Sequence, residues 1–273
     1  QIHPLAKTEI EQEIGSTAYH GGTLDLGAGH LHPLQFAFGL ALAAHKAGVR
    51  IFETSRVTSF TQASPAHVRT DRADIKAHYV VLACNGYLGP LEPSIAAKVM
   101  PINNFMIATE PLSDAAAAQL IRNHYAVADS RFVINYFRLS KDNRLLFGGG
   151  ESYGYRFPGD IRSVVKKPML EIFPYLKNIP IDYAWGGTLA ITLNRMPCFC
   201  RIKGHILSVS GYSGHGLALS TLAGLLVARA IDGQAGAFDI MEKVPTPSFP
   251  GGMALRWPLL VLGMTWFALR DRL

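Results

Sequence analysis

Near the C-terminal end of this chain of 273 residues, two apolar runs flank a glycine-rich stretch in HILSVSGYSGHGLALSTLAGLLVARAI, residues 205–231. HILSVS is short and strand-like, whereas LALSTLAGLLVARAI carries apolar and small residues at helical spacing until Asp232-Gly233 ends it. The glycines between them predict a strand–turn–helix unit. Because the first turn of a helix has unpaired amides and a partial positive charge, such a unit can hold an anion or a developing negative charge.

Three kinds of ligand or chemistry can be considered for this strand–turn–helix unit. A dinucleotide pyrophosphate fits poorly, because the G-x-G-x-x-G fingerprint needs glycine where Ser213 stands, and no acidic residue closes a second strand about twenty residues later. A serine hydrolase would use Ser213 as nucleophile in a G-x-S-x-G-like elbow, but His215 occupies the fifth position and no histidine follows it. The third ligand is a flavin, whose reduced form is electron-rich and suits the helix N-terminus.

Composition narrows the class of protein. With 49% hydrophobic and 17% charged residues, the chain can bury the core of one large or two modest domains. The net charge of +6 is scattered without a dense basic stripe, so we expect no nucleic-acid partner. No apolar signal region opens the chain, and WPLLVLGMTWFAL near its end is too short to span a bilayer. We expect that segment to be a tail helix packed on the body.

The chain has three cysteines, Cys84, Cys198 and Cys200. They do not form a disulfide framework, and a Cys-x-Cys pair places both thiols on one side of a strand rather than in bridging geometry. As a metal site the pair lacks nearby partners in the sequence. We therefore predict buried free thiols, no metal site, and a reducing, cytoplasmic setting.

The order of predicted elements indicates a mixed α/β and α+β fold. LQFAFGLALAAHKAGV predicts an amphipathic helix closed by Gly48, and RIFETSRVTSF predicts a strand directly after it, which together favour a partly parallel sheet. A polar hairpin and the strand YVVLACN follow. Between about Leu91 and Arg201, strand-like runs alternate poorly with helices, apart from one helix at DIRSVVKKPMLEIFPYL. This region predicts an antiparallel sheet domain inserted between pieces of the α/β domain.

The run GYSGHGLALSTLAGLLVARAI resembles the C-terminal flavin segment of the D-amino-acid-oxidase-like family of FAD-dependent amine oxidases. The segments GGTLDLGAGHLHPLQFAFGLALAAHKAGVRIFETSRVTSF, ADIKAHYVVLACNGYLG, YFRLSKDNRLLFGGGES and WGGTLAITLNRMP resemble further parts of that family, in the family's order. The branch of γ-glutamylputrescine oxidases is the most similar, including the tail LRWPLLVLGMTWFALRDRL. Together these segments cover most of the chain.

The resemblance implies an incomplete two-domain FAD-dependent amine oxidase fold. Residues 30–92 and 201–245 correspond to part of an FAD-binding α/β domain, and residues 1–29 and 93–200 to a substrate domain with a mostly antiparallel sheet flanked by helices. Residues 246–273 correspond to the tail helix. The family's G-x-G-x-x-G turn near the N-terminus has no counterpart here, so we expect a fragment that binds no FAD and has no turnover in isolation.

The resemblance also implies a set of cofactor-binding residues, some beside the adenine or pyrophosphate and some beside the flavin ring. They are Val57, Ala83, Cys84, Asn85, Gly86, Gly211, Ser213, Gly214, His215 and Gly216. Without the resemblance, Val57 and Ala83 could equally be strand core, and the glycines could serve only a tight turn and close helix packing. These residues favour FAD binding only because they occur together and in the order found in the family.

The expected reaction is hydride transfer from the carbon next to an amine to the flavin, which leaves an imine, with oxygen as the family's usual acceptor. Gly187 stands where sarcosine-oxidase-like relatives carry the cysteine that bonds the flavin, which implies non-covalent FAD. Leu146 stands where they carry a lysine that promotes the oxygen reaction, which leaves the acceptor open. Arg138, with Tyr136 beside it, either faces a small-molecule amine substrate or lies on a solvent-facing strand, and His215 is a further catalytic candidate.

Two other functions stay open at this stage. One is the serine hydrolase that uses Ser213, and the other is a non-catalytic binding module whose apolar tail docks on a partner. The sequence sets neither the particular amine nor the oligomeric state.

Overall fold

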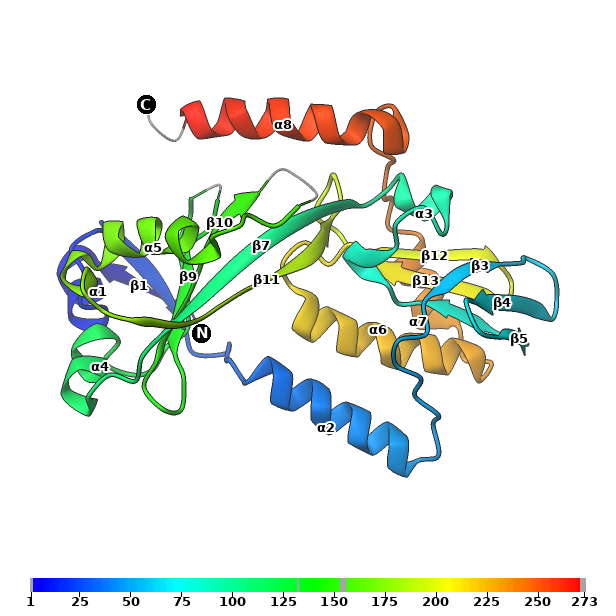
Figure 1. Ribbon diagram of the computed structural model, residues 1–273, viewed down its shortest axis with the longest axis horizontal. Helices are drawn as coiled ribbons and strands as arrows, with labels where there is room; N and C mark the ends of the chain where they lie inside the picture. Colours follow the sequence, from blue (N-terminus) through cyan, green and yellow to red (C-terminus); the bar gives the residue numbers. More distant parts are fainter. Residues whose placement is uncertain (1, 132, 153–155, 271–273) are drawn as a thin grey trace. The chain divides into compact units, whose positions relative to one another are not determined.

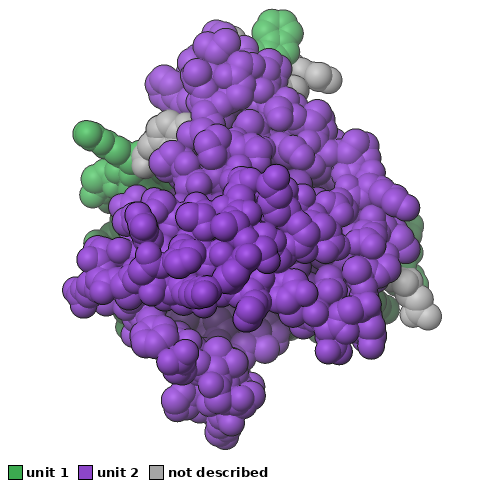
Figure 2. Space-filling model, turned by 90° about the vertical axis from the view of Figure 1, so that its right-hand side faces the viewer, with its two compact units in different colours: residues 1–32, 103–187, 264–273 green, residues 33–102, 188–263 purple. Residues whose placement is uncertain are grey.

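The computed structural model describes residues 2–131, 133–152 and 156–270. The chain divides into two compact units, which Figure 2 shows in different colours. Unit 1 comprises residues 1–32, 103–187 and 264–273, and unit 2 comprises residues 33–102 and 188–263. Each unit is assembled from segments that are distant in the sequence, so the chain passes repeatedly from one unit to the other.

Unit 1 combines an antiparallel sheet with short helices. Its elements are β1 (Ile2–Ala6), α1 (Lys7–Glu13), β2 (Gly21–Asp25), β7 (Met100–Thr109), α4 (Asp114–Leu120), β8 (Val127–Ala128), β9 (Tyr136–Leu139), β10 (Leu145–Ser152), α5 (Ile161–Ile172), the 3-10 turn η2 (Pro174–Leu176) and β11 (Ile181–Ile191), with β7 and β11 extending a few residues into unit 2. The larger sheet has the order β11-β7-β10-β9-β8, and β10 pairs antiparallel with both β7 and β9. The predicted antiparallel sheet is therefore confirmed.

One apolar core lies between this sheet and α5, which packs along β10 (Figure 1). Alternate residues of the strands face it, as a period of two requires, so Phe105, Phe137 and Phe147 are at most 2% exposed. The Phe137 and Phe147 rings stack with centroids 5.5 Å apart, and Phe173 meets Phe137 edge-on at 5.1 Å. These contacts make the sheet and α5 a single packed body.

Helix α5 ends earlier than the sequence predicts. It begins after Asp160, whose carboxylate accepts a hydrogen bond from the Ser163 amide at 3.2 Å, and it buries Val165, Met169 and Ile172 at helical spacing. It stops at Ile172 rather than continuing through Leu176. The residue before a proline is disfavoured in the helical conformation, and Phe173, with φ −125° and ψ +70°, leaves it before the short 3-10 turn that starts at Pro174.

Unit 2 holds the longer helices and two small sheets. Its elements are α2 (Pro33–Lys46), β3 (Val57–Phe60), β4 (Ala66–Thr70), β5 (Asp74–Ala77), β6 (Val80–Leu82), the 3-10 turn η1 (Asn85–Tyr87), α3 (Pro93–Ala96), β12 (Cys198–Lys203), β13 (Ile206–Ser210), α6 (Gly216–Ile231), α7 (Gly236–Glu242) and most of α8 (Gly252–Arg270). The sheet that contains the strand of the predicted strand–turn–helix unit has the order β12-β13-β6.

The predicted strand–turn–helix unit is present as β13, a glycine-rich turn and α6. Strand β13 pairs in parallel with β6, and its five residues are all buried. Helix α6 packs Ala223, Leu226 and Val227 against the apolar side chains of β12, β13 and α7, and Figure 1 shows it running along that sheet. Because the β13–β6 pairing is parallel, both strands end at the same edge of the sheet.

The strand predicted for residues 50–60 is only partly correct. Strand structure begins at Val57, and β3 pairs antiparallel with β4, which forms the predicted polar hairpin with β5. A strand needs a neighbour for its amides and carbonyls, and within the described residues nothing pairs with residues 50–56. The helix predicted before it does form as α2, but its apolar side is not covered: no α2 residue is buried, and Phe38 is 64% exposed.

The tail predicted as a helix forms α8, which continues through Pro258 instead of breaking there. Arg256, only 5% exposed, anchors its first half by donating hydrogen bonds to the carbonyls of Ala96 and Val99. The last residues of the predicted tail, 271–273, lie outside the described part of the chain. A search of the described residues finds no helix with the length and apolar character needed to cross a bilayer.

Candidate functional site

The turn between β13 and α6 has a backbone that explains its glycines. Gly211, Ser213 and Gly214 all adopt positive φ, at +72°, +51° and +96°. A side chain at Gly211 would also collide with Thr192, because a Cβ there would lie 2.5 Å from the Thr192 methyl carbon. L-residues rarely adopt this conformation, so the sequence must use glycine or a short polar residue at these positions.

Ser213 serves the turn rather than acting as a nucleophile. Its amide donates to the Ala190 carbonyl at 3.0 Å, and its hydroxyl donates to the Gly211 carbonyl at 3.2 Å and accepts from the Thr192 amide at 3.3 Å. The side chain is 9% exposed, and among the described residues neither an imidazole nor a carboxylate hydrogen-bonds to it. A serine hydrolase needs a base within hydrogen-bond reach of its nucleophile, so the hydrolase interpretation is wrong.

The N-terminus of α6 is open beyond this turn. His215 is the N-cap residue, and its side chain makes no capping hydrogen bond. Gly214 is exposed, and the space where its Cβ would stand contains no atom within 4 Å. The first amides of α6, at Gly216 and after, therefore carry the partial positive charge of a helix start without a side-chain cap.

A second predicted segment, Ala83–Gly86, ends β6 beside this turn. The Asn85 side chain accepts a hydrogen bond from the Gly211 amide at 3.1 Å, which ties the two segments together. Asn85 itself has φ +45°, a conformation that asparagine tolerates better than most residues. Gly86 is required for close packing, because a Cβ there would lie 2.7 Å from the Thr188 carbonyl oxygen and 2.8 Å from that of Leu189. Burial raises the pKa of the Cys84 thiol.

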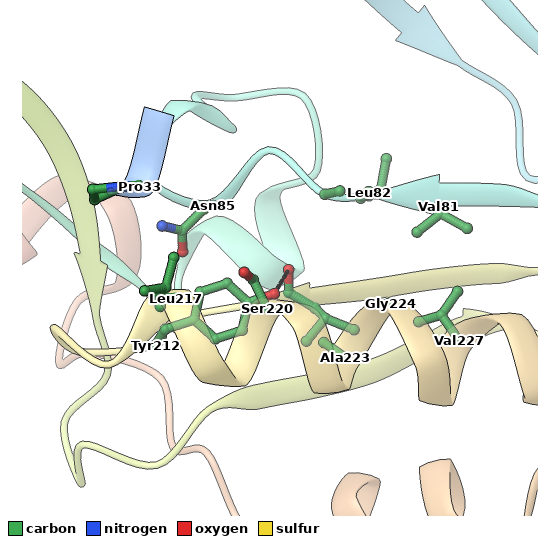
Figure 3. Close-up of a pocket in the computed structure, with 13 residues that line it drawn as sticks. Pro33, Val81, Leu82, Asn85, Tyr212, Leu217, Ser220, Ala223, Gly224 and Val227 are labelled. Carbon is green, nitrogen blue, oxygen red and sulfur yellow. Dashed lines mark hydrogen bonds between the residues drawn. The ribbon is translucent and has the colours of Figure 1, made fainter. Parts of the chain in front are cut away.

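These two segments border a cavity of about 530 Å³ within unit 2 (Figure 3). Its lining residues come from the start of α2, the ends of β6 and β13, and one side of α6. They are Pro33, Val81, Leu82, Ala83, Asn85, Val209, Tyr212, Gly216, Leu217, Ser220, Ala223, Gly224 and Val227. Figure 3 shows Asn85, Tyr212 and Leu217 at one end and Val81 with Val227 at the other. Asn85 and Tyr212 bring polar groups to the end at the helix N-terminus, Ser220 adds a hydroxyl between the two ends, and the remaining lining residues are apolar.

The sequence predicted only part of this cavity. Ala83, Asn85 and Gly216 line it, whereas Val57 lies in β3 and is not among the lining residues. Most of the wall along α6 was missed. A signal for it existed, since Gly216, Ser220, Ala223 and Val227 recur at the spacing of one helix face. Their small size is what leaves room beside β6.

The other predicted residues lie in unit 1, on the face of the antiparallel sheet opposite its core. Strand β9 alternates, so Phe137 and Leu139 enter the core while Tyr136 and Arg138 point the other way. The Tyr136 ring lies over Gly148, where a Cβ would come within 2.1 Å of it, and its hydroxyl donates to Asn104. Burial lowers the pKa of Arg138, whose guanidinium donates to the Leu139 carbonyl at 3.2 Å. Tyr136, Arg138 and Asn104 thus form a partly buried polar group.

An uncapped helix start beside a mostly apolar cavity, in a chain that also carries an antiparallel sheet unit, agrees with the fold predicted from the resemblance to flavin-dependent oxidoreductases. The family model described as "DAO: FAD dependent oxidoreductase" matches residues 2–230. The chain belongs to this family of FAD-dependent oxidoreductases, as its sequence predicted.

Individual relatives agree with this assignment. Gamma-glutamylputrescine oxidoreductase of Escherichia coli (strain K12) is 43% identical over 274 residues, covering 100% of this chain and 64% of the relative. The probable oxidoreductase OrdL of Rhizobium meliloti (strain 1021) is 40% identical, covering 98% of this chain and 62% of the relative. The chain therefore spans somewhat less than two thirds of the length of these relatives.

Solved structures show the same fold at lower identity. Glycine oxidase from Geobacillus kaustophilus superposes with a TM-score of 0.75 at 21% identity, covering 88% of this chain and 65% of that structure. L-proline dehydrogenase from P. horikoshii gives a TM-score of 0.69 at 21% identity, covering 84% and 64%. The predicted mixture of a partly parallel α/β part and an antiparallel sheet part is confirmed by these structures and by the observed topology.

Proposed function

We propose that this chain is the larger part of an FAD-dependent oxidoreductase that oxidises the CH–NH bond of a small amine or amino acid. The observation that supports this most is the uncapped N-terminus of α6, which opens at the polar end of the cavity beside Asn85. Family membership supplies the cofactor class. The 43% identity to gamma-glutamylputrescine oxidoreductase favours a γ-glutamylated or similar polyamine as substrate.

The residues around the turn fit a flavin. Reduced flavin is electron-rich, and the amides at Gly214 and Gly216 offer positive charge with open space in front of Gly214. Gly211 and Ser213 hold the turn, while Ala83, Cys84, Asn85 and Gly86 form the adjacent strand end. Val57, on β3, is proposed to lie toward the adenine. Gly187 offers no side chain for attachment, so the FAD is proposed to be non-covalent.

FAD, when bound, supplies the two-electron acceptor for the amine carbon. The chain's own contribution is to bind and orient the amine and to exclude water. We assign Tyr136 and Arg138 to the amine side, because they share the partly buried polar face of the sheet in unit 1. His215 is exposed at the helix start, and its amide donates to the Tyr212 carbonyl at 3.0 Å, so we propose that it shapes the turn beside the cofactor. Oxygen is the proposed final acceptor.

The three cysteines are free, which supports a reducing, cytoplasmic compartment. Among the described residues, no group of three or more potential ligands gathers for a metal ion, so the proposal involves no metal.

The test uses the complete native protein that contains this chain. We expect flavin absorption bands in the purified protein, and bleaching of the bands when γ-glutamylputrescine is added without oxygen. Gly214→Asp tests this assignment most directly. Aspartate tolerates positive φ better than most residues, and its negative charge suits a free helix N-terminus but repels an electron-rich ligand. It should lower the flavin reduction potential and weaken FAD binding at least tenfold. A side chain at φ +96° also strains the backbone, and Gly214→Asn measures that effect by itself.

Two control variants also place a side chain at a glycine with positive φ. Gly214→Asn keeps the side-chain shape without the charge and should have a much smaller effect on the potential. Gly233→Asp lies at the opposite end of α6, with φ +85° and the same open surroundings as Gly214. It should leave the flavin unaffected. Equal effects of Gly214→Asp and Gly233→Asp on the potential would refute the assignment of the flavin to the N-terminus of α6.

A further inference from the structure

A pair of thiols lies directly behind the functional turn, and the proposed function does not use it. Cys198 and Cys200 project from the same side of β12, with their sulfur atoms 3.4 Å apart. The sequence predicted no partners for them, but the structure supplies two from distant segments. The Lys98 ammonium approaches the Cys200 sulfur at 3.5 Å, and the Thr246 hydroxyl approaches the Cys198 sulfur at 3.4 Å.

These neighbours favour one thiolate within the pair. The hydrogen bond from Cys200 lowers the pKa of Cys198 to about 6, against the opposing effect of burial, and Thr246 and the charge of Lys98 act in the same direction. The same hydrogen bond raises the pKa of Cys200, together with burial. The two sulfurs therefore share one proton near neutral pH and titrate as a unit. A thiolate beside a cation is the reactive form of cysteine.

We propose that Cys198 and Cys200 form an oxidisable dithiol that hydrogen peroxide converts to a reversible disulfide. The Cys198 sulfur carries the thiolate of the reduced pair, and the partly exposed Cys200 adjoins it. The Cys198 thiolate attacks one peroxide oxygen, the O–O bond breaks, and the released hydroxide takes up a proton from solvent to become water. The Cys200 thiol then attacks the sulfenic sulfur, the S–O bond breaks, and the second hydroxide leaves with the thiol proton as water. Two thiols are oxidised, and one peroxide is reduced to two waters.

The geometry favours a labile disulfide over a structural one. Residues two apart on a strand have Cα atoms about 6.6 Å apart, near the upper limit of about 6.8 Å for a disulfide. The bridge can therefore form only with strain, and a strained disulfide is readily reduced. Its formation also removes the hydrogen bonds that Lys98 and Thr246 make to the reduced pair.

The position of the pair links it to the turn. Cys198 is the cross-strand partner of Ser210, the last residue of β13. A Cβ built on Gly211, the next residue, would lie 3.8 Å from the Cys198 Cβ. The pair is packed with Val99 and Ala190, and the carbonyl of Ala190 holds the Ser213 amide. A change in the β12 sulfurs therefore acts on the segment that sets the start of α6.

The test uses the full-length protein, reduced and then treated with hydrogen peroxide before alkylation and peptide mapping. We expect a Cys198–Cys200 disulfide, reversed by dithiothreitol, while Cys84 remains alkylable. Cys84→Ser is the matched control, since Cys84 is a half-buried thiol in the same unit that packs on a cluster also touched by Cys200. That variant should form the disulfide at the wild-type rate, and Cys198→Ser and Cys200→Ser should not form it.

A second measurement separates the proposal from ordinary thiol oxidation. Lys98→Met removes the cation beside Cys200, so disulfide formation near neutral pH should slow severalfold, with a smaller difference at alkaline pH where the thiolate forms without help. Circular dichroism checks that each variant is folded. A disulfide that involves Cys84, oxidation to a dithiothreitol-resistant acid without a disulfide, or a Lys98→Met rate equal to wild type at all pH values would overturn the proposal.

Discussion

The two units bury their apolar residues in different ways. In unit 1, one cluster joins the antiparallel sheet to α5, and Phe105, Phe147 and Phe173 in it are fully buried. In unit 2 the buried residues form smaller separate clusters, and large apolar side chains stay exposed on several of its helices. Phe38 of α2 is 64% exposed, and Leu225 of α6 is 48% exposed.

The two units therefore take their stability from different parts of the structure. Unit 1 is closed around its own side chains, so its candidate functional residues lie on the sheet face away from the core. Unit 2 exposes apolar surface and an uncapped helix start, both of which are features that a bound ligand or a further protein segment can cover. Substitutions should therefore affect the stability of unit 1 most through its core, and that of unit 2 most through its tight turns.

The largest expected effect is in the core of unit 1. Phe147→Ala removes a ring that stacks on Phe137 in a fully buried position, so the free energy of unfolding of unit 1 should fall by about 3–5 kcal/mol. Phe38→Ala is the control in unit 2 and should change stability by less than about 0.5 kcal/mol, because that ring is mostly exposed. Urea unfolding followed by circular dichroism measures both. Similar losses for the two variants would show that α2 is packed in solution.

The next largest effect contrasts two glycines of unit 2. Gly86→Ala places a methyl group against the backbone carbonyls of Thr188 and Leu189, and the required shift should cost about 1–3 kcal/mol. Gly39→Ala lies inside α2, where nothing stands within 4 Å of the new methyl, and should stabilise the helix by up to about 1 kcal/mol. Thermal unfolding compares them. A Gly86→Ala protein as stable as wild type would mean that the Ala83–Gly86 segment is loosely held.

A smaller effect is expected at the link between the two segments of the turn. Asn85→Gly keeps the positive φ but leaves the Gly211 amide without its acceptor, at a cost of about 1 kcal/mol. Asn85→Asp retains an acceptor oxygen and should recover most of the loss. Amide hydrogen exchange at Gly211 should rise in the glycine variant only. Unchanged exchange there would show that Asn85 does not hold the turn in solution.

Local chemistry made the strand–turn–helix unit predictable from sequence, because positive φ at Gly211 and Gly214 demands glycine and α6 has a clear helical period. The antiparallel strands of unit 1 were predictable for the same kind of reason, since Phe137 and Leu139 alternate with polar neighbours. The predictions that failed depended on contacts with residues from distant segments, which the sequence of one segment does not show. Residues 50–56 look like a strand, but within the described residues they have no neighbour, and Lys98 reaches Cys200 only through the fold.

The smallest predicted effect compares an exposed carboxylate in each unit. In unit 2, hydrogen bonds from His67 and then Arg69 lower the pKa of Asp74 below 3.8, and in unit 1 those from Ser140 and then Arg144 lower the pKa of Asp142. A lowered folded-state pKa means that each interaction is fully present above the unfolded pKa and is lost as pH falls through the folded one. His67→Ala removes the hydrogen bond that lowers the Asp74 pKa most, and Ser140→Ala removes the corresponding one to Asp142, so the NMR titration midpoint of each carboxyl carbon should move up towards the ordinary aspartate value. An unchanged midpoint in either variant would show that its hydrogen bond does not form in solution.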